Sequence, residues 1–588
     1  MRVADRGGLG SKTGAYFGRA TPRERPYTMK FLTERLGLFI AAAVVLARLL
    51  VLDIDPPVRD LTDYLAKDEC FYVQAAYDLY ENGRAFEQTG PSWFGQPAVT
   101  NVVAYASLNL FGDNYYGLRS GSVLLSLLCL LLMHVQLRRI TSDPWLLHLP
   151  PVILATDLSF GWAGIIVEPT MGRMAMMLLV MWMVIRVLAN GRPSNARVVL
   201  LGVLATGLSL PTYPTNAFVV PATWSALVLS SGLPFHRWRS HASTTLLFAF
   251  GAMLAMAAIV GISHLLGGSD VAGFSTTKGN FASRVAVLPS GWLFNILHIT
   301  SGNLFRLNPS LLLLWLTSLV MLFVVPMRRW KPVVIVVCSF TLFLLAQTVL
   351  INDYPHRKLV ILLPLVLLAI AAAYEHAGEW TVSVTTRGPL RTAIVFLLLF
   401  VVLWSTWMQV SPSPFETTSV RRAFWPGIIV LLAFVGAMMF LGTHHPEKWF
   451  RHRWLLVLLL VPGVINSVRT MVVEGTHNYR DLSIDLREFD HKSFIGAASL
   501  GFRVNNAIQV EFSPYLVAGG YINSWPELSR RAHADTTTNY SIGYFDQRKE
   551  FANIGFDPIR VMVMNPEETW RERQFILYRE RERISKDK

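Results

Sequence analysis

Two neighbouring carboxylates, Asp68 and Glu69, follow the first long apolar run of the chain, at the head of a predicted helix that ends at Gly83. Carboxylates at a helix start satisfy free backbone N–H groups and favour the helix dipole. A carboxylate can also take the proton from an attacking hydroxyl. The pair therefore either caps the helix or carries chemistry. Tyr64 and Tyr72 share a predicted helix face with Asp68 and would line the same surface.

Glu168 and Arg173 form the second charged feature. Glu168 precedes a proline at the start of an apolar run, and Arg173 lies inside that run. An arginine within a membrane span costs on the order of 3 kcal/mol, so it usually faces a partner or a polar cavity. Two interpretations stay open. Arg173 either snorkels to the membrane surface or pairs with Glu168 in a structural role, or both side chains line a polar cavity.

Cations also gather at span ends that are predicted to lie on the same, exterior side. They are Arg119 at the start of one apolar run, and Arg357 and Lys358, together with Tyr354 and His356, ahead of another. Positive charge on exterior loops is disfavoured by the positive-inside rule. A phosphate at the membrane interface would explain the cluster, because arginine binds phosphate oxygens in two-point fashion. Interfacial anchoring with Tyr354 is the alternative.

These carboxylates and cations suit one type of reaction, the displacement of a phosphate leaving group by an acceptor hydroxyl. A carboxylate would deprotonate the acceptor, and the cations would stabilise the departing phosphate. The sequence contains no glycine-rich phosphate loop, no HExxH motif and no CxxC motif. Nucleotide hydrolysis and zinc chemistry therefore have no support, and we expect no cofactor. A divalent cation at Asp68 and Glu168 is a minority alternative.

The composition is that of an all-α polytopic membrane protein. Of 588 residues, 52% are hydrophobic and 16% are charged, and the mean hydropathy is +0.40. The apolar residues fall into runs of roughly 18–22, the length of a membrane-spanning helix. The net charge of +14 is concentrated in short loops between these runs. That distribution is typical of cytoplasmic loops in a lipid bilayer protein and argues against nucleic-acid binding.

We expect about 13 spans, a basic cytoplasmic N-terminus over residues 1–30 and a transmembrane domain over 31–468. Residues 53–116 would form the first exterior loop. Within this loop the apolar stretch 94–112 is interrupted by Pro97, Thr100 and Asn101, which favours a helix at the interface over a span. The predicted spans are 35–52, 117–136, 144–163, 171–188, 198–212, 216–232, 244–266, 308–326, 332–351, 358–374, 391–409, 425–442 and 454–468.

Residues 469–588 differ in kind and predict a small extracytoplasmic α/β domain. The stretch 507–513 alternates with period two, 558–566 is a β-branched run, and 524–532 has a helix-start pattern. The charged tail from Trp570 onward predicts a solvated helix or a frayed end. Our hypothesis is that this domain helps to bind or select the acceptor.

The order of these motifs resembles the GT-C fold glycosyltransferases that use polyprenyl-phosphate sugars, the group that contains protein O-mannosyltransferases and the lipid A aminoarabinose transferase. "KDECFYVQAAYDLYENG" resembles the family's Asp-Glu pair and its following helix. "GQPAVTNVVAYASLNLFGDNYYGLRSGSV" resembles the interfacial helix, the FG turn and the opening of the next span. "VEPTMGRMAM" and "RKLVILLPLVLL" resemble the second acidic motif and a late span.

The resemblance implies a membrane enzyme that transfers one sugar, with inversion, from a polyprenyl-phosphate donor to an acceptor hydroxyl on a glycan, lipid or protein. It implies that Asp68 is the catalytic base, that Glu69 orients the acceptor and that Glu168 is the second-loop acid. Arg119 would contact the donor phosphate, with Arg173, Arg357 and Lys358 nearby. The excess of Arg over Lys favours a bacterial inner (plasma) membrane, with the transfer on its exterior, periplasmic face.

Three departures argue against assigning the aminoarabinose or the protein O-mannosyl substrate. Gln96 stands where relatives carry Lys, Glu168 stands where Asp is common, and "LPTYPTN" lacks a Lys that some relatives have. Two other functions stay open. A lipid-linked glycan flippase would need polar groups at mid-membrane, and a structural or assembly subunit with this fold would have no activity.

Overall fold

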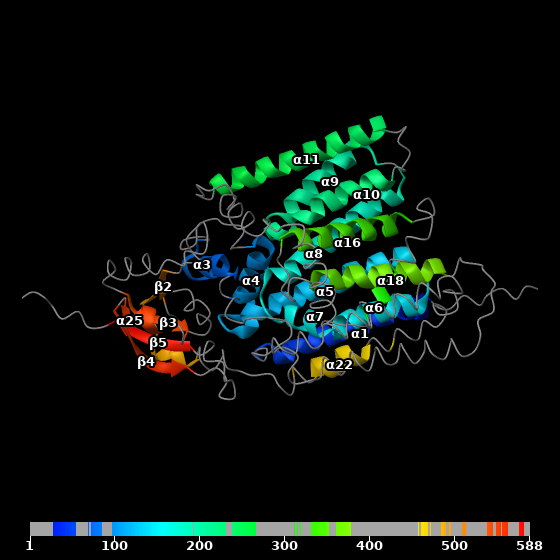
Figure 1. Ribbon diagram of the computed structural model, residues 1–588. Helices are drawn as coiled ribbons and strands as arrows, with labels where there is room; N and C mark the ends of the chain where they lie inside the picture. Colours follow the sequence, from blue (N-terminus) through cyan, green and yellow to red (C-terminus); the bar gives the residue numbers. More distant parts are fainter. Residues whose placement is uncertain are drawn as a thin grey trace, which may run out of the picture.

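The computed structural model describes residues 27–54, 69, 72–84, 97–191, 193–230, 238–265, 331–351, 360–377, 460–468, 484–489, 493–495, 509–512, 538–544, 548–553, 555–562 and 575–580, and the single residues 311, 314, 315, 318, 457 and 471. These residues form a bundle of helices that run side by side, with a five-stranded sheet beyond one end of the bundle (Figure 1). Helices α3 and α4 lie at that same end. The fold is thus mostly helical, as predicted.

The helices of the described part are α1 (Tyr27–Ala47), η1 (Arg48–Val51), α3 (Gln74–Asn82), α4 (Ala98–Phe111), α5 (Tyr115–Ile140), α6 (Pro144–Thr156), α7 (Leu158–Ala163), α8 (Pro169–Ala189), α9 (Asn195–Ser209), η2 (Pro214–Phe218), α10 (Val219–Ser230), α11 (Trp238–Leu265), α16 (Pro332–Ile351), η7 (Val360–Leu362), α18 (Leu363–Ala377), α22 (Leu460–Val468), η10 (Leu486–Phe489) and α25 (Arg548–Asn553). Most of them fall on predicted spans. The predicted interfacial helix is α4, which begins directly after Pro97 as the fixed φ of proline allows.

Three helices in the described part are long and apolar enough to cross a membrane, namely Tyr115–Ile140, Pro169–Ala189 and Ser240–Ile262. The protein is therefore a membrane protein. The predicted spans 391–409 and 425–442 lie outside the described residues, so the total of about 13 stays a prediction.

Helices α5 and α8 form the centre of the bundle and pack against each other. Around them lie α1, α6, α10, α16 and α18. Helix α11 lies at the edge, against α9 (Figure 1), and exposes apolar side chains such as Leu246, Phe250 and Met253. An edge helix of this composition suits contact with lipid.

Helices α9 and α11 approach each other backbone to backbone through a pair of glycines. A Cβ on Gly202 would overlap the carbonyl oxygen of Phe248, and a Cβ on Gly251 would overlap that of Val199. Small residues permit such close packing between membrane helices. The same α9 also holds Gly207, where a Cβ would lie 4.0 Å from the Cβ of Ala255 and would be tolerated.

We expect Gly202→Ala to lower the free energy of unfolding by about 1–3 kcal/mol, because the added methyl group must push α11 away from α9. The measurement is thermal unfolding of the protein purified in detergent. Gly207→Ala is the matched control, and the better helix propensity of alanine should leave its stability unchanged or slightly raised. Equal melting temperatures for the two variants would contradict the close contact.

The sheet consists of β1 (Ser493–Ile495), β2 (Gln509–Phe512), β3 (Thr538–Tyr544), β4 (Phe556–Met562) and β5 (Phe575–Glu580) in the order β2-β1-β3-β5-β4. Strand β1 runs parallel to both β2 and β3, whereas β5 is antiparallel to β3 and β4. Helix α25 packs on the sheet through Phe551, whose ring stacks on Tyr578 with the centroids 4.2 Å apart. Strands β2 and β4 fall in the two stretches predicted as strands.

The prediction for the charged tail was wrong. Instead of a helix or a frayed end, it contains β5, which lies between β3 and β4 with Ile576, Leu577 and Tyr578 buried. The flanking arginines and glutamates dominated the sequence pattern, whereas Ile576, Leu577 and Tyr578 are the buried residues of the strand.

The sheet and the helices at its end of the bundle share one apolar cluster. This cluster contains buried residues from both parts. The helices contribute Val73 and Tyr77 from α3 and its N-cap, Leu108 from α4 and Leu118 from α5, and the strands contribute Phe494, Ile542, Met562 and Leu577. The C-terminal strands therefore support the segment that follows Asp68 and Glu69. Their predicted part in acceptor selection stays a prediction.

Candidate active site

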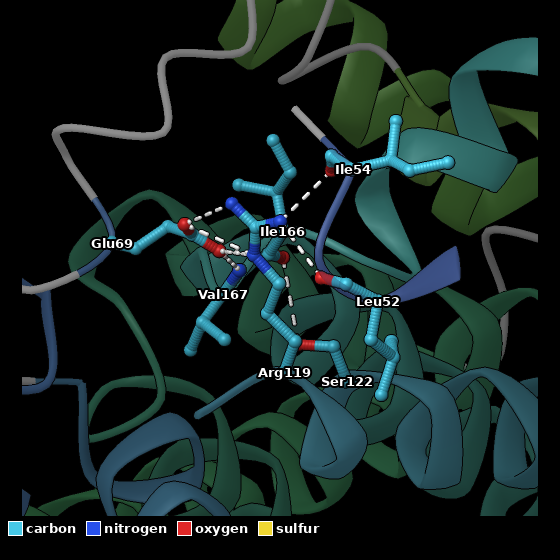
Figure 2. A network of polar contacts seen from close by, with 7 residues as sticks. All are labelled: Leu52, Ile54, Glu69, Arg119, Ser122, Ile166 and Val167. Carbon is cyan, nitrogen blue, oxygen red and sulfur yellow. Dashed lines mark hydrogen bonds and ion pairs between the residues drawn. The ribbon is translucent and has the colours of Figure 1, made fainter. Parts of the chain in front are cut away.

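The centre of the site is a buried ion pair between Glu69 and Arg119 (Figure 2). Arg119 Nη2 lies 2.7 Å from Glu69 Oε2, and Arg119 Nε lies 2.9 Å from Oε1. The side chains are 0% and 1% exposed. This is the two-point geometry that makes arginine–carboxylate hydrogen bonds strong.

Arg119 also binds the end of the first helix. Its Nη1 donates to the carbonyl oxygens of Leu52 and Ile54, both at 2.8 Å, and its guanidinium lies 4.5 Å from the ring centre of Tyr115. One side chain at the start of α5 therefore fixes two segments, the end of η1 and the residue that follows Asp68 in the sequence. Breaking such a buried pair is costly because it leaves a charge uncompensated.

Glu69 has a further partner in the backbone just before α8. The N–H of Val167 donates to Glu69 Oε1 at 2.9 Å, and the Ser122 hydroxyl donates to the carbonyl oxygen of Ile166 at 3.4 Å (Figure 2). The next residue is Glu168, which occupies the N-cap position of α8 and is 4% exposed. Glu69 thus brings the first and second acidic segments together.

Arg173 lies one turn further into α8, where it is 4% exposed and surrounded by the loop between α9 and α10. Its Nη2 donates to the carbonyl oxygen of Thr215 at 3.4 Å, and its own carbonyl oxygen accepts from Asn216 Nδ2 at 3.3 Å. Its guanidinium lies 5.6 Å from the ring centre of Tyr213. The ring of Tyr213 in turn meets that of Tyr72 edge-on at 6.3 Å. Tyr72 and Arg173 therefore both lie beside the ring of Tyr213.

Asn101 fastens α3 to α4. Its amide nitrogen donates to the carbonyl oxygens of Tyr72 and Pro97 at 2.9 and 3.0 Å, and its oxygen accepts from the N–H of Ala76 at 2.9 Å. A backbone hydrogen bond joins the start of α4 to the α9–α10 loop. The N–H of Ala98 donates to the carbonyl oxygen of Pro211 at 2.8 Å. All the segments that carry candidate residues in the described part thus meet at the α3–α4 end of the bundle.

Comparison of the sequence with protein-family models and with characterised protein sequences gives no match. Comparison of the structure with solved structures does give matches. ArnT from Cupriavidus metallidurans bound to undecaprenyl phosphate aligns with a TM-score of 0.54 and 12% identity, covering 94% of this chain and 98% of ArnT. The chain has the GT-C fold.

Two further structures belong to the same comparison. ArnT from the same organism in the apo state aligns with a TM-score of 0.51 and 12% identity over 92% of this chain and 98% of ArnT. The arabinosyltransferase EmbB from Mycobacterium smegmatis gives a TM-score of 0.46 and 14% identity over 78% of this chain and 42% of EmbB. The resemblance in the motifs predicted the GT-C fold correctly.

Within this GT-C fold the structure describes five of the predicted site residues and brings them to one region: Glu69, Tyr72, Arg119, Glu168 and Arg173. The others lie outside the described residues: Tyr64, Asp68, Tyr354, His356, Arg357 and Lys358. Among the residues that the structure does describe, no group of three or more His, Cys, Asp or Glu side chains lies close enough to hold a metal ion.

The predicted helix from the carboxylate pair to Gly83 is interrupted. Helix α3 begins at Gln74 and has Val73 at its N-cap, where no side chain caps it. Its end is as predicted, since Gly83 has φ 68°, the left-handed conformation that favours glycine. Glu69 therefore does not belong to the first turn of α3, and its carboxylate binds Arg119 and Val167 instead.

The predicted contact of Arg119 with a donor phosphate stays a prediction. In this structure Nε, Nη1 and Nη2 all donate to groups of the protein itself, and the side chain is fully buried. This arrangement favours a positioning role, in which Arg119 holds Glu69 and residues 52–54. Arg173 lies beside the ring of Tyr213 and the α9–α10 loop, and its predicted contact with the donor phosphate also stays a prediction.

Sequence reasoning missed three polar residues at this end of the bundle: Asn101, Tyr213 and Asn216. Asn101 had a visible signal, since it interrupts an apolar helix, where an amide needs partners. Tyr213 and Asn216 lie in "LPTYPTN", a polar stretch with two prolines between two apolar runs. Gln347 in α16, which binds Thr215 and Phe218 in this loop, gave the same kind of signal.

Proposed function

We propose that the protein is a membrane glycosyltransferase that moves a single sugar from a polyprenyl-phosphate donor to an acceptor hydroxyl, with inversion at the anomeric carbon. The GT-C fold supports this proposal, and one of the two aligned ArnT structures contains undecaprenyl phosphate. The polyprenyl chain would lie in the bilayer, and the acceptor would be a glycan, lipid or protein.

In the proposed reaction the acceptor oxygen attacks the anomeric carbon of the sugar. The bond from that carbon to the phosphate oxygen breaks, and polyprenyl phosphate leaves with the electron pair. The acceptor proton goes to Asp68 as general base. Arg173, with Arg357 and Lys358, stabilises the charge on the leaving phosphate. The chemistry needs no metal or cofactor.

The observation that carries the proposal is the position of Glu69. Its carboxylate is held by Arg119 and by the N–H of Val167, so the residue next to Asp68 is fixed against the start of α8, one residue from Glu168. A base works only when it is within hydrogen-bond reach of the proton that it takes. Glu69 supplies this fixed position, and we assign to it a positioning role.

The α3–α4 end of the bundle would face the exterior of the inner (plasma) membrane, the periplasm in a bacterium, with residues 1–30 in the cytoplasm. This orientation follows the distribution of basic loops. It places the sheet of residues 493–580 outside the membrane, beside the site, in a chain of about 13 spans.

The test is a transfer assay with the full chain in proteoliposomes. Undecaprenyl-phosphate mannose, glucose and arabinose are supplied with an extract of cell-envelope acceptors, and release of undecaprenyl phosphate is followed by mass spectrometry. We expect consumption of at least one donor, with inverted anomeric configuration by NMR of the product. Movement of an intact lipid-linked sugar across the bilayer without release of undecaprenyl phosphate would show a flippase and overturn the proposal.

A further inference from the structure

Three buried polar side chains surround the first turns of α8 and have oxygen atoms that lack hydrogen-bond partners among all described residues. They are Thr100 Oγ1, Thr215 Oγ1 and Asn216 Oδ1. The residues are 3%, 6% and 0% exposed. Buried polar atoms in folded proteins are nearly always paired, so unpaired ones at one place indicate a missing partner such as a ligand or an ordered water.

The three residues lie around the same two residues of α8. Thr100 Oγ1 lies 3.4 Å from the position that a Cβ of Gly172 would occupy. Asn216 and Thr215 both contact Arg173, at 3.3 and 3.4 Å. Gly172 is one helical turn after Glu168 and therefore shares its helix face. The unpaired oxygens thus belong to the candidate active site.

The chemistry of this cluster selects the kind of ligand. The oxygen of an Asn side chain accepts hydrogen bonds and donates none, so Asn216 Oδ1 needs a ligand with an O–H or N–H group. Neither an ionised phosphate nor a polyprenyl chain has such a group. Sugar hydroxyls donate and accept, which matches two threonine hydroxyls and one amide oxygen. The nearby ring of Tyr213 offers an apolar face to the C–H groups of a sugar.

We propose that Thr100, Thr215 and Asn216 bind hydroxyl groups of the donor's sugar ring and determine which sugar is transferred. This inference rests on the proposed glycosyltransferase function and names the part of the substrate that this cluster recognises. The donor phosphate then lies toward the Arg173 guanidinium. The ring hydroxyls bind Thr100 Oγ1, Thr215 Oγ1 and Asn216 Oδ1, the three oxygen atoms that have no partner among the described residues.

Thr100→Val and Thr215→Val are the cleanest variants, because valine keeps the shape and removes a hydroxyl that makes no hydrogen bond to a described residue. Asn216→Leu removes the amide oxygen but also the bond to the Arg173 carbonyl oxygen, so it serves as a supporting variant. Thr223→Val in α10 is the matched control, because Thr223 is also buried with an unpaired hydroxyl but does not contact Gly172 or Arg173 in any described interaction.

The experiment compares the preferred donor of the wild-type protein with its monodeoxy analogues, each linked to undecaprenyl phosphate, in the transfer assay. With the wild-type protein, removal of one recognised hydroxyl should lower kcat/KM by about tenfold. With Thr100→Val or Thr215→Val, the same removal should change kcat/KM less than twofold, because the partner is already gone. Thr223→Val should discriminate like the wild type, and bare undecaprenyl phosphate should bind equally to all four proteins.

Two results would overturn the inference while the proposed function stands. The variants could slow every analogue by the same factor, or they could lower the melting temperature of the ligand-free protein, as expected if the oxygens hold an ordered structural water. A wild-type protein that consumes no donor would instead overturn the proposed function, and this inference with it.

Discussion

Asp68→Asn is expected to lower the rate of sugar transfer by about 10²–10⁴-fold without changing the melting temperature. Asparagine has the shape of aspartate but cannot take the acceptor proton. Glu69 cannot replace the lost base, because its carboxylate is engaged by Arg119 and by the N–H of Val167 in a buried environment. The measurement is release of undecaprenyl phosphate in proteoliposomes, together with thermal unfolding in detergent.

Glu81→Gln is the control for Asp68→Asn. Glu81 is an exposed carboxylate near the end of α3, so its replacement tests for a general effect of lost negative charge in this loop. We expect wild-type rates for this variant. Full activity of Asp68→Asn would refute the assignment of Asp68 as the base, because the transfer would then proceed without its carboxylate.

The second large effect concerns stability. Arg119→Met should lower the free energy of unfolding by about 3–5 kcal/mol, because it leaves the Glu69 carboxylate buried without its guanidinium. It also removes the donor to the carbonyl oxygens of Leu52 and Ile54. The double variant Glu69→Gln with Arg119→Met should lose less than the sum of the two single variants, since no unpaired charge remains. Thermal unfolding of the four proteins in detergent measures this coupling.

Arg560→Met provides the matched control. Arg560 pairs with Asp485 and Glu488, but all three side chains are about half exposed, and such surface pairs contribute only about 0–1 kcal/mol. If Arg119→Met lowered the free energy of unfolding as little as Arg560→Met, the buried pair would not hold the site together. Strict additivity in the double variant would lead to the same conclusion.

The three long apolar helices α5, α8 and α11 were predictable because lipid imposes the same demand on every transmembrane helix, about 20 apolar residues, whatever its neighbours are. The motif order was sufficient to predict the GT-C fold. Strand β5 was missed, because Ile576, Leu577 and Tyr578 become buried only when the strand pairs with β3 and β4, and nothing local in a charged tail indicates those neighbours. Burial by distant strands overrides local pattern in sheets.

The residue types of the candidate site were predicted from the sequence, but the contacts between these residues were predicted only in part. Glu69 and Arg119 were both selected from the sequence, but for separate roles. Their pairing depends on how the loop before α3 meets the start of α5, which no spacing rule determines. The unpaired oxygens of Thr100 and Asn216 were equally invisible, because an unmet hydrogen bond is a property of the assembled bundle.

The apolar cluster that joins α3 and α4 to the strands also sets an order of events during synthesis. Val73 and Leu577 contribute to it from positions roughly 500 residues apart, and contacts between such distant segments form late. The helices near the N-terminus leave the ribosome early, but Val73 and Tyr77 reach their final packing only after β5 has been synthesised and paired. A nascent chain therefore completes the α3–α4 end of the bundle last, after the N-terminal helices have formed.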